Sequence, residues 1–111
     1  MKALQILTIL AALTLPAHAA ETTTYVGVIT DTMCGLDHVA MKNGPETKCV
    51  RECVGDGRTY KYAIAVGTSI HTLSDQQTPA RYAGEKVKIT GVLYTKTNIL
   101  KVERIERLNG R

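Results

Sequence analysis

Every cysteine of this 111-residue chain falls between residues 34 and 53, and a histidine lies among them. Cys34 is followed four positions later by His38, and Cys49 is followed four positions later by Cys53. On a helix, residues four apart share a face with Cβ atoms about 5–6 Å apart, so each pair can reach one metal ion through bonds of roughly 2.0–2.3 Å. Two such pairs facing each other predict a Cys3His metal site.

The residue types leave the identity of the ion open between copper(I) and zinc. A Cys3His set suits Zn(II) in a closed structural site, whereas thiolates with thioether neighbours suit Cu(I) equally well. Met33 and Met41 adjoin the cluster as possible auxiliary ligands and tilt the prediction slightly toward copper, although methionine also fills irregular cores. Asp31 and Asp37 are interpreted either as groups that orient the ligands or as a helix cap and a solvated charge. His38 has a similar alternative as a surface histidine that binds nothing.

The first twenty residues predict export. Met1-Lys2 supplies a positive start, the stretch 3–15 is mostly apolar, and Pro16 precedes the small-residue box Ala17-His18-Ala19. These are the three parts of a cleavable secretory signal peptide, so we expect residues 1–20 to be removed by cleavage near Ala19 or Ala20. The protein is then periplasmic or secreted, and residues 21–111 contain no apolar stretch long enough to span a membrane.

An oxidising compartment makes a disulfide the competing interpretation of the cysteines. Cysteines of small exported domains usually pair, and three cysteines leave one spare thiol. Cys49 and Cys53 are poorly placed for a bond within one helix, since a disulfide needs Cβ atoms about 3.8 Å apart. Cys34 would therefore pair with Cys49 or with Cys53. A thiol redox protein is the third interpretation, disfavoured because the spacing is not Cys-x-x-Cys and no βαβ pattern surrounds it.

Composition limits the class of protein. The formal net charge is +4, of which Lys2 belongs to the predicted signal, and no run of Lys or Arg supports nucleic-acid binding. The chain lacks Phe and Trp, so Val, Ile, Leu and five Tyr must build a modest core in a single domain over residues 21–111. A core this lean often needs a disulfide or a metal to stabilise it.

Alternating apolar residues and turn residues predict a mainly β fold. Five strands are expected, over Tyr25–Asp31, Tyr60–Val66, Ser69–Leu73, Lys86–Tyr94 and Ile99–Ile105. Gly67-Thr68 is the expected hairpin turn, and one helical turn is expected within 75–82, capped by Asp75, limited by Pro79 and closed by Gly84. This order matches a small five-stranded OB-like barrel.

The cysteines belong to a long insertion, residues 32–59, between the first two predicted strands. Loops of this length usually have a function or a structure of their own. Gly44-Pro45 and Gly55 bracket a predicted helix over 46–54 that carries Cys49 and Cys53. A second helical turn is expected over 36–42.

The quoted motifs resemble those of a group of small exported bacterial proteins. The stretch 27–35 has the pattern G-x-I-x-D-x-x-C-G and is followed by His38, by C-x3-C-V at 49–54 and by G-x-x-Y at 57–60. The stretch 83–92 is similar to the fourth strand of small OB-type exported proteins. The resemblance implies an OB-like fold and one shared site, and it implies no substrate.

Together these patterns predict a periplasmic soft-metal-binding protein that handles copper or zinc as a chaperone, buffer or sensor. Its partners would be the metal ion and another periplasmic protein. The runner-up is a disulfide-stapled binding module with a contact face around Tyr60, Tyr62 and Tyr94. An enzyme ranks third, because the sequence has no paired-carboxylate signature, no glycine-rich phosphate loop and no hydrolase motif.

Overall fold

The computed structural model describes residues 21–36 and 46–108. The predicted signal peptide, the ligand candidates His38 and Met41, Asp37 and nearly all of the predicted turn over 36–42 lie outside these ranges. None of the helices within the described ranges is long and apolar enough to cross a bilayer.

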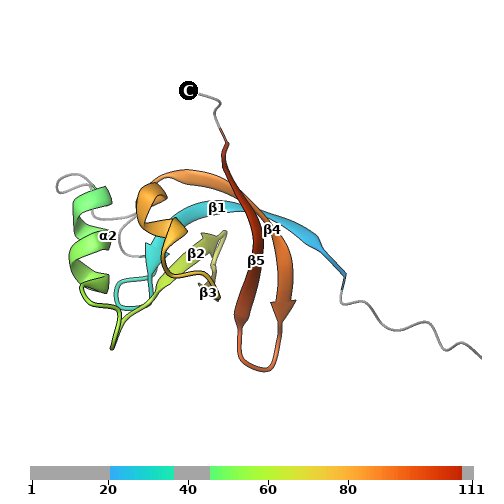
Figure 1. Cartoon of the computed structure of the whole chain (residues 1–111), viewed down its shortest axis with the longest axis horizontal. Helices are drawn as coiled ribbons and strands as arrows, with labels where there is room; N and C mark the ends of the chain where they lie inside the picture. Colours follow the sequence, from blue (N-terminus) through green and yellow to red (C-terminus); the bar gives the residue numbers. More distant parts are fainter. Residues whose placement is uncertain (1–20, 37–45, 109–111) are drawn as a thin grey trace, which may run out of the picture.

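The described residues form a mainly β fold, a five-stranded OB-like barrel with a helical insertion, as the sequence predicts (Figure 1). Its strands and helices follow one another as β1 (Thr23–Asp31), α2 (Glu46–Val54), β2 (Tyr62–Val66), β3 (Ser69–Leu73), the 3-10 helix η1 (Thr78–Tyr82), β4 (Lys86–Tyr94) and β5 (Ile99–Arg107). The predicted turn at Gly67-Thr68 joins β2 to β3. Element order and type are therefore confirmed, with shifts of a few residues at the ends.

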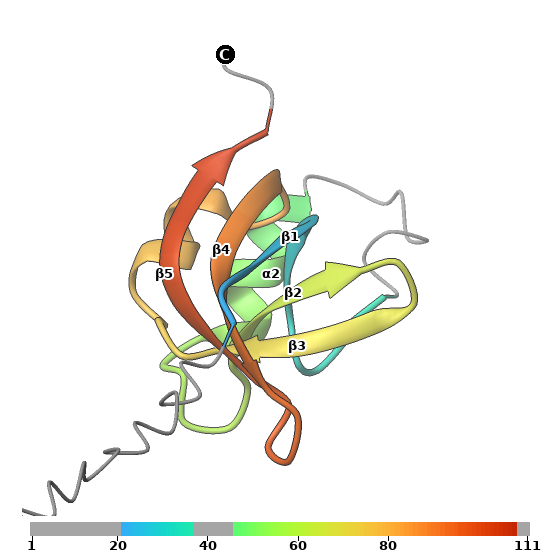
Figure 2. The same cartoon turned by 90° about the vertical axis from the view of Figure 1, so that its right-hand side faces the viewer.

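β1 connects the two halves of the barrel. Its first part, through Val28, pairs antiparallel with β4, and its last part, from Val28 to Asp31, pairs antiparallel with β2. The remaining pairings run from β2 to β3 and from β5 to β4, and a short parallel contact of β3 with β5 joins only two residue pairs. The strand order is thus β1-β2-β3-β5-β4 (Figure 2). The end of β1 is therefore held by its backbone pairing with β2 and by the packing of Ile29 in the core.

The backbones of β4 and β5 approach each other closely at Gly91. A register shift between Thr90 and Gly91 marks a bulge in β4. A Cβ atom at Gly91 would overlap the carbonyl oxygen of Lys101, so this close approach of two backbones requires glycine.

Two valines attach α2 to the barrel core. Val50 and Val54 are buried and lie four residues apart on one face of the helix, where they pack with core residues such as Ile29 and Ile64. Arg51 of α2 donates a hydrogen bond from Nε to the carbonyl oxygen of Ala80 in η1, at 3.0 Å. The helix is therefore fixed to both the strands and η1, which lie beside it in Figure 1.

Some details differ from the sequence prediction. β2 begins at Tyr62 and not at Tyr60, because Lys61 exchanges hydrogen bonds with Thr32 in the turn after β1. Pro79 stands in the first turn of η1, where it does not limit the helix. The cap residue of η1 is Gln77 and not the predicted Asp75, whose carboxylate instead accepts hydrogen bonds from the backbone N–H groups of Gln77 and Thr78 just before the helix.

The predicted tyrosine contact face is not formed by all three tyrosines. Tyr62 is only 7% exposed, because it lies opposite Asp31 in the β1–β2 ladder and packs into the core, where burial raises its pKa. Tyr60 is half-buried and Tyr94 is 48% exposed. Tyr62 is therefore a core residue and cannot contact a partner.

Replacement of Val50 by Ala should lower the free energy of unfolding by about 2 kcal/mol, because it removes two fully buried methyl groups and leaves a cavity. Val26, which is 41% exposed on β1, provides the control: Val26→Ala should cost less than about 1 kcal/mol. Urea denaturation measures both. Equal losses for the two variants would contradict the assignment of α2 as part of the core.

Candidate functional site: two thiols and a buried carboxylate

Asp31 ends β1 and organises the turn that follows. Its side chain is completely buried, and its Oδ1 accepts hydrogen bonds from the backbone N–H groups of Met33 and Cys34, each at 2.9 Å. Its carbonyl oxygen accepts a further bond from the N–H of Gly35 at 3.0 Å. Aspartate favours such turns because its short carboxylate reaches backbone donors two or three residues on. The turn therefore fixes the backbone of Cys34.

Two neighbours hold this turn in place. The Thr30 hydroxyl is buried and donates to the carbonyl oxygen of Gly35 at 2.7 Å, and Gly35 adopts a φ of +55°, which a side chain would strain. Thr32 donates its N–H to the carbonyl oxygen of Lys61 and accepts the N–H of Lys61 on its hydroxyl, both at 3.0 Å. The turn is thus bonded to itself and to the residue before β2.

α2 supplies the second thiol. Cys53 is half-buried beside the core residue Val54, while Cys49, one turn earlier, is exposed. The helix ends where Gly55 takes a φ of +56° and donates its N–H to the carbonyl oxygen of Arg51. Because Val50 and Val54 fix the rotation of the helix, the Cys53 side chain is directed at the turn after β1.

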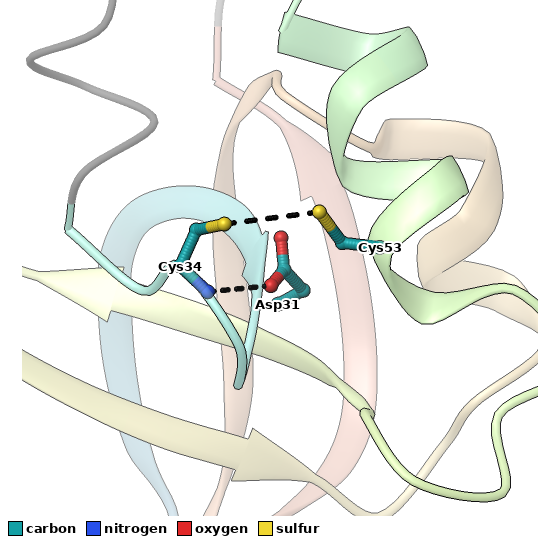
Figure 3. A group of neighbouring side chains, drawn as sticks. All are labelled: Asp31, Cys34 and Cys53. Atoms are coloured by element: carbon teal, nitrogen blue, oxygen red, sulfur yellow. Dashed lines mark hydrogen bonds between the residues drawn. The ribbon is translucent and has the colours of Figure 1, made fainter.

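Three ligand atoms converge between the turn and the helix (Figure 3). The sulfur atoms of Cys34 and Cys53 point toward each other at 3.7 Å, and the carboxylate of Asp31 lies between them. One oxygen of Asp31 and the two sulfurs all lie within 4.8 Å of one another, so the group could hold a metal ion. Carboxylate oxygen and thiolate sulfur are both zinc ligands in proteins.

The structure brings together two of the four predicted ligands. Cys34 and Cys53 meet, Cys49 lies on the same helix outside the three-residue group, and His38 is outside the described residues. Met33 stands next to Cys34 but is 56% exposed. The ligand set Cys34, His38, Cys49 and Cys53 stays a prediction.

Sequence reasoning gave Asp31 only an orienting or capping role, and the structure places it inside the group. It does cap the turn, through Oδ1, and it also faces the two sulfurs. The spacing Asp-x-x-Cys at the end of a strand was the signal that could have indicated this, because an aspartate that caps a turn lies beside the residue three positions on.

The surroundings of Cys53 disfavour the negatively charged thiolate form of its side chain. Burial raises the pKa of the Cys53 thiol to about 12, helped by its hydrogen bond with Cys34 and by the charges of Asp31, Cys34 and Cys49. Cys53 is therefore a protonated thiol at neutral pH. This is the opposite of a reactive cysteine, whose pKa is lowered by positive surroundings.

No protein-family model matches this chain, and no curated protein and no solved structure matches it. The resemblance to small exported bacterial proteins stays a prediction, and an inference about function rests on the chemistry of the site.

The raised pKa of Cys53 predicts that the metal-free protein loses stability in alkali. The folded state keeps a proton up to about pH 12 that the unfolded chain, with an ordinary thiol pKa of 9.0, releases earlier. This contribution to stability is therefore complete below about pH 9 and disappears as the pH rises toward 12.

Thermal unfolding between about pH 8 and about pH 11 measures this effect, with Cys53→Ser as the control for all other titrating groups. The wild-type midpoint should fall more steeply with pH than that of the variant. Parallel curves for the two proteins would show that the Cys53 thiol is not perturbed by its neighbours.

Proposed function

We propose that this protein binds a soft metal ion through Asp31, Cys34 and Cys53 and handles that metal outside the cytoplasm, as a chaperone, buffer or sensor. One observation carries the proposal: two thiols and a completely buried carboxylate converge within 4.8 Å. Three acidic groups this close repel one another when ionised, and this repulsion adds to burial and to the hydrogen bond with Cys34 in raising the pKa of Cys53. A divalent cation removes that repulsion and stabilises the deprotonated ligands.

The distance between the sulfurs favours zinc over copper(I). Two thiolates in a tetrahedral site with Zn–S bonds of about 2.3 Å lie about 3.8 Å apart, whereas a linear two-thiolate site with the same bonds would separate them by about 4.6 Å. The Cys34–Cys53 distance of 3.7 Å agrees with the tetrahedral arrangement. The carboxylate ligand favours zinc as well, because Cu(I) prefers sulfur.

The ligands are held before any metal binds. Cys34 sits in a turn that has backbone, carboxylate and hydroxyl hydrogen bonds, and Cys53 is on a helix with two buried valines. Sites supported in this way lose little conformational entropy on binding, which raises affinity. Tetrahedral zinc takes a fourth ligand, for which His38 and water are the candidates.

A disulfide between Cys34 and Cys53 is the second candidate. The same 3.7 Å contact supports it, because a side-chain rotation could bring the two sulfurs to the bond length of about 2.0 Å. The bond would connect the turn after β1 to the end of α2 and would stabilise the fold by about 3 kcal/mol. The protein would then be a stapled binding module, with Cys49 as a spare thiol.

Mass spectrometry of the purified protein separates the two candidates. The metal proposal requires one bound metal ion in the native spectrum and three alkylatable thiols after denaturation. A denatured mass about 2 Da below that of the reduced chain, with no metal in the native spectrum, would overturn it. Stoichiometric copper in place of zinc would overturn only the choice of ion.

Asp31→Asn should weaken zinc binding at least about tenfold while the fold persists. The amide oxygen of asparagine can still accept the two backbone N–H bonds of the turn, but the negative charge is lost. A competition titration against a chromogenic chelator measures the affinity, and thermal unfolding confirms that the variant is folded.

Asp56 provides the matched control. It also accepts a backbone N–H, that of Arg58 at 3.0 Å, but its side chain is 67% exposed. Asp56→Asn should leave the zinc affinity unchanged. Wild-type affinity in Asp31→Asn would remove Asp31 from the ligand set.

A further inference from the structure

The third cysteine has no part in the three-residue group, and its position gives it a different chemistry. Cys49 is exposed on α2, one helical turn before Cys53. Cys53 and Cys34 are half-buried, and Asp31 is completely buried. Cys49 is therefore the most exposed of these four acidic side chains, and Asp31 is the most buried.

Cys49 is close enough to interact with the site. Its position four residues before Cys53 places the two Cβ atoms about 5–6 Å apart on one face of the helix. Cys49 is nevertheless outside the group whose ligand atoms lie within 4.8 Å of one another.

We propose that Cys49 is the exchange ligand of the metal site, through which the ion passes between Asp31, Cys34 and Cys53 and an external partner that offers a thiolate. This inference rests on the proposed metal-binding function. It assigns the partner by its chemistry, as a protein or peptide with exposed cysteines.

The transfer is a ligand exchange without oxidation or reduction. The Cys49 sulfur forms a bond to the ion and its proton leaves to solvent, while the bond from Cys53 to the ion breaks and the Cys53 sulfur takes up a proton. A thiol of the acceptor then forms its own bond to the ion and releases its proton, and the bond from Cys49 breaks and that sulfur is protonated again. A second acceptor thiol replaces Cys34 in the same way, releasing its proton as the Cys34 sulfur takes one up, and water replaces the Asp31 carboxylate, which leaves as the carboxylate. The metal keeps its charge throughout, and all the ligands exchange by substitution alone.

Asp31, Cys34 and Cys53 are poorly placed to pass an ion directly to an acceptor. An acceptor sulfur must come within about 2.3 Å of the ion, and the candidate ligands belong to two half-buried cysteines and a completely buried aspartate. Cys49 is exposed on a helix that Val50 and Val54 anchor, so it offers the ion a fixed position that an acceptor can reach.

The experiment compares the rate of transfer with the equilibrium affinity. The wild type and Cys49→Ser are reduced with a phosphine, loaded with Zn(II) and mixed in a stopped-flow instrument with a synthetic peptide that carries two cysteines. We expect Cys49→Ser to transfer zinc at least about tenfold more slowly, while its affinity in a chelator competition changes by less than about threefold.

A relocated thiol provides the matched control. The double variant Lys48→Cys with Cys49→Ser keeps the number of thiols but turns one of them about 100° around the helix, away from Cys53. Lys48 is exposed and its side chain forms an ion pair with Glu52 at 3.7 Å on the helix surface, so the fold should tolerate the change. This variant should stay as slow as Cys49→Ser.

Each other result has a distinct meaning. Transfer at the wild-type rate in Cys49→Ser, or full rescue by the relocated thiol, would overturn the exchange role. A loss of affinity greater than about tenfold in Cys49→Ser would make Cys49 a resident ligand and would also overturn it. If the wild type binds no zinc, the proposed function fails together with this inference.

Discussion

The buried carboxylate of Asp31 is the group on which the rest of the site depends. A carboxylate with no exposure would be costly without partners, and two backbone N–H groups supply them at 2.9 Å. The same hydrogen bonds set the path of the chain from β1 into the turn and therefore the position of Cys34. The charge also lies beside both sulfurs and contributes to the raised pKa of Cys53. One side chain thus positions Cys34 and adds, beside burial, to the electrostatics of the group.

The distance between the two sulfurs is a consequence of core packing. Asp31 lies opposite Tyr62 in the β1–β2 ladder, so the turn begins at a position fixed by the sheet. α2 is fixed by Val50 and Val54, which belong to the same buried cluster as Ile29 of β1. The sheet therefore positions Cys34 and α2 positions Cys53. Both elements contribute to one hydrophobic core, although the two cysteines are 19 residues apart in sequence. The fold itself therefore positions the three groups of the candidate site.

Sequence patterns predicted the strands and the helix correctly because residues within each segment determine its secondary structure. Alternating apolar residues identified the strands, and Pro45 and Gly55 marked the helix that carries Cys49 and Cys53. The site was harder to predict, because a shared helix face suggested that these two cysteines act as one pair. The structure joins Cys53 to Cys34 and Asp31, since the burial of two valines decides the rotation of the helix. The spacing of residues cannot reveal which strand end the Cys53 side chain faces.

The Asp31 carboxylate also distinguishes the two proposed roles of Cys34 and Cys53, which are a metal site and a disulfide. A disulfide is neutral and gains nothing from a buried negative charge beside it, and the desolvation of that charge would still have to be offset by hydrogen bonds. A metal cation gains a ligand and a compensating charge from the same group. Both uses need Cys34 and Cys53 in contact, so that contact alone does not favour either. The position of Asp31 between the sulfurs is therefore the observation behind the proposed cation site, since these three groups together could hold a metal ion.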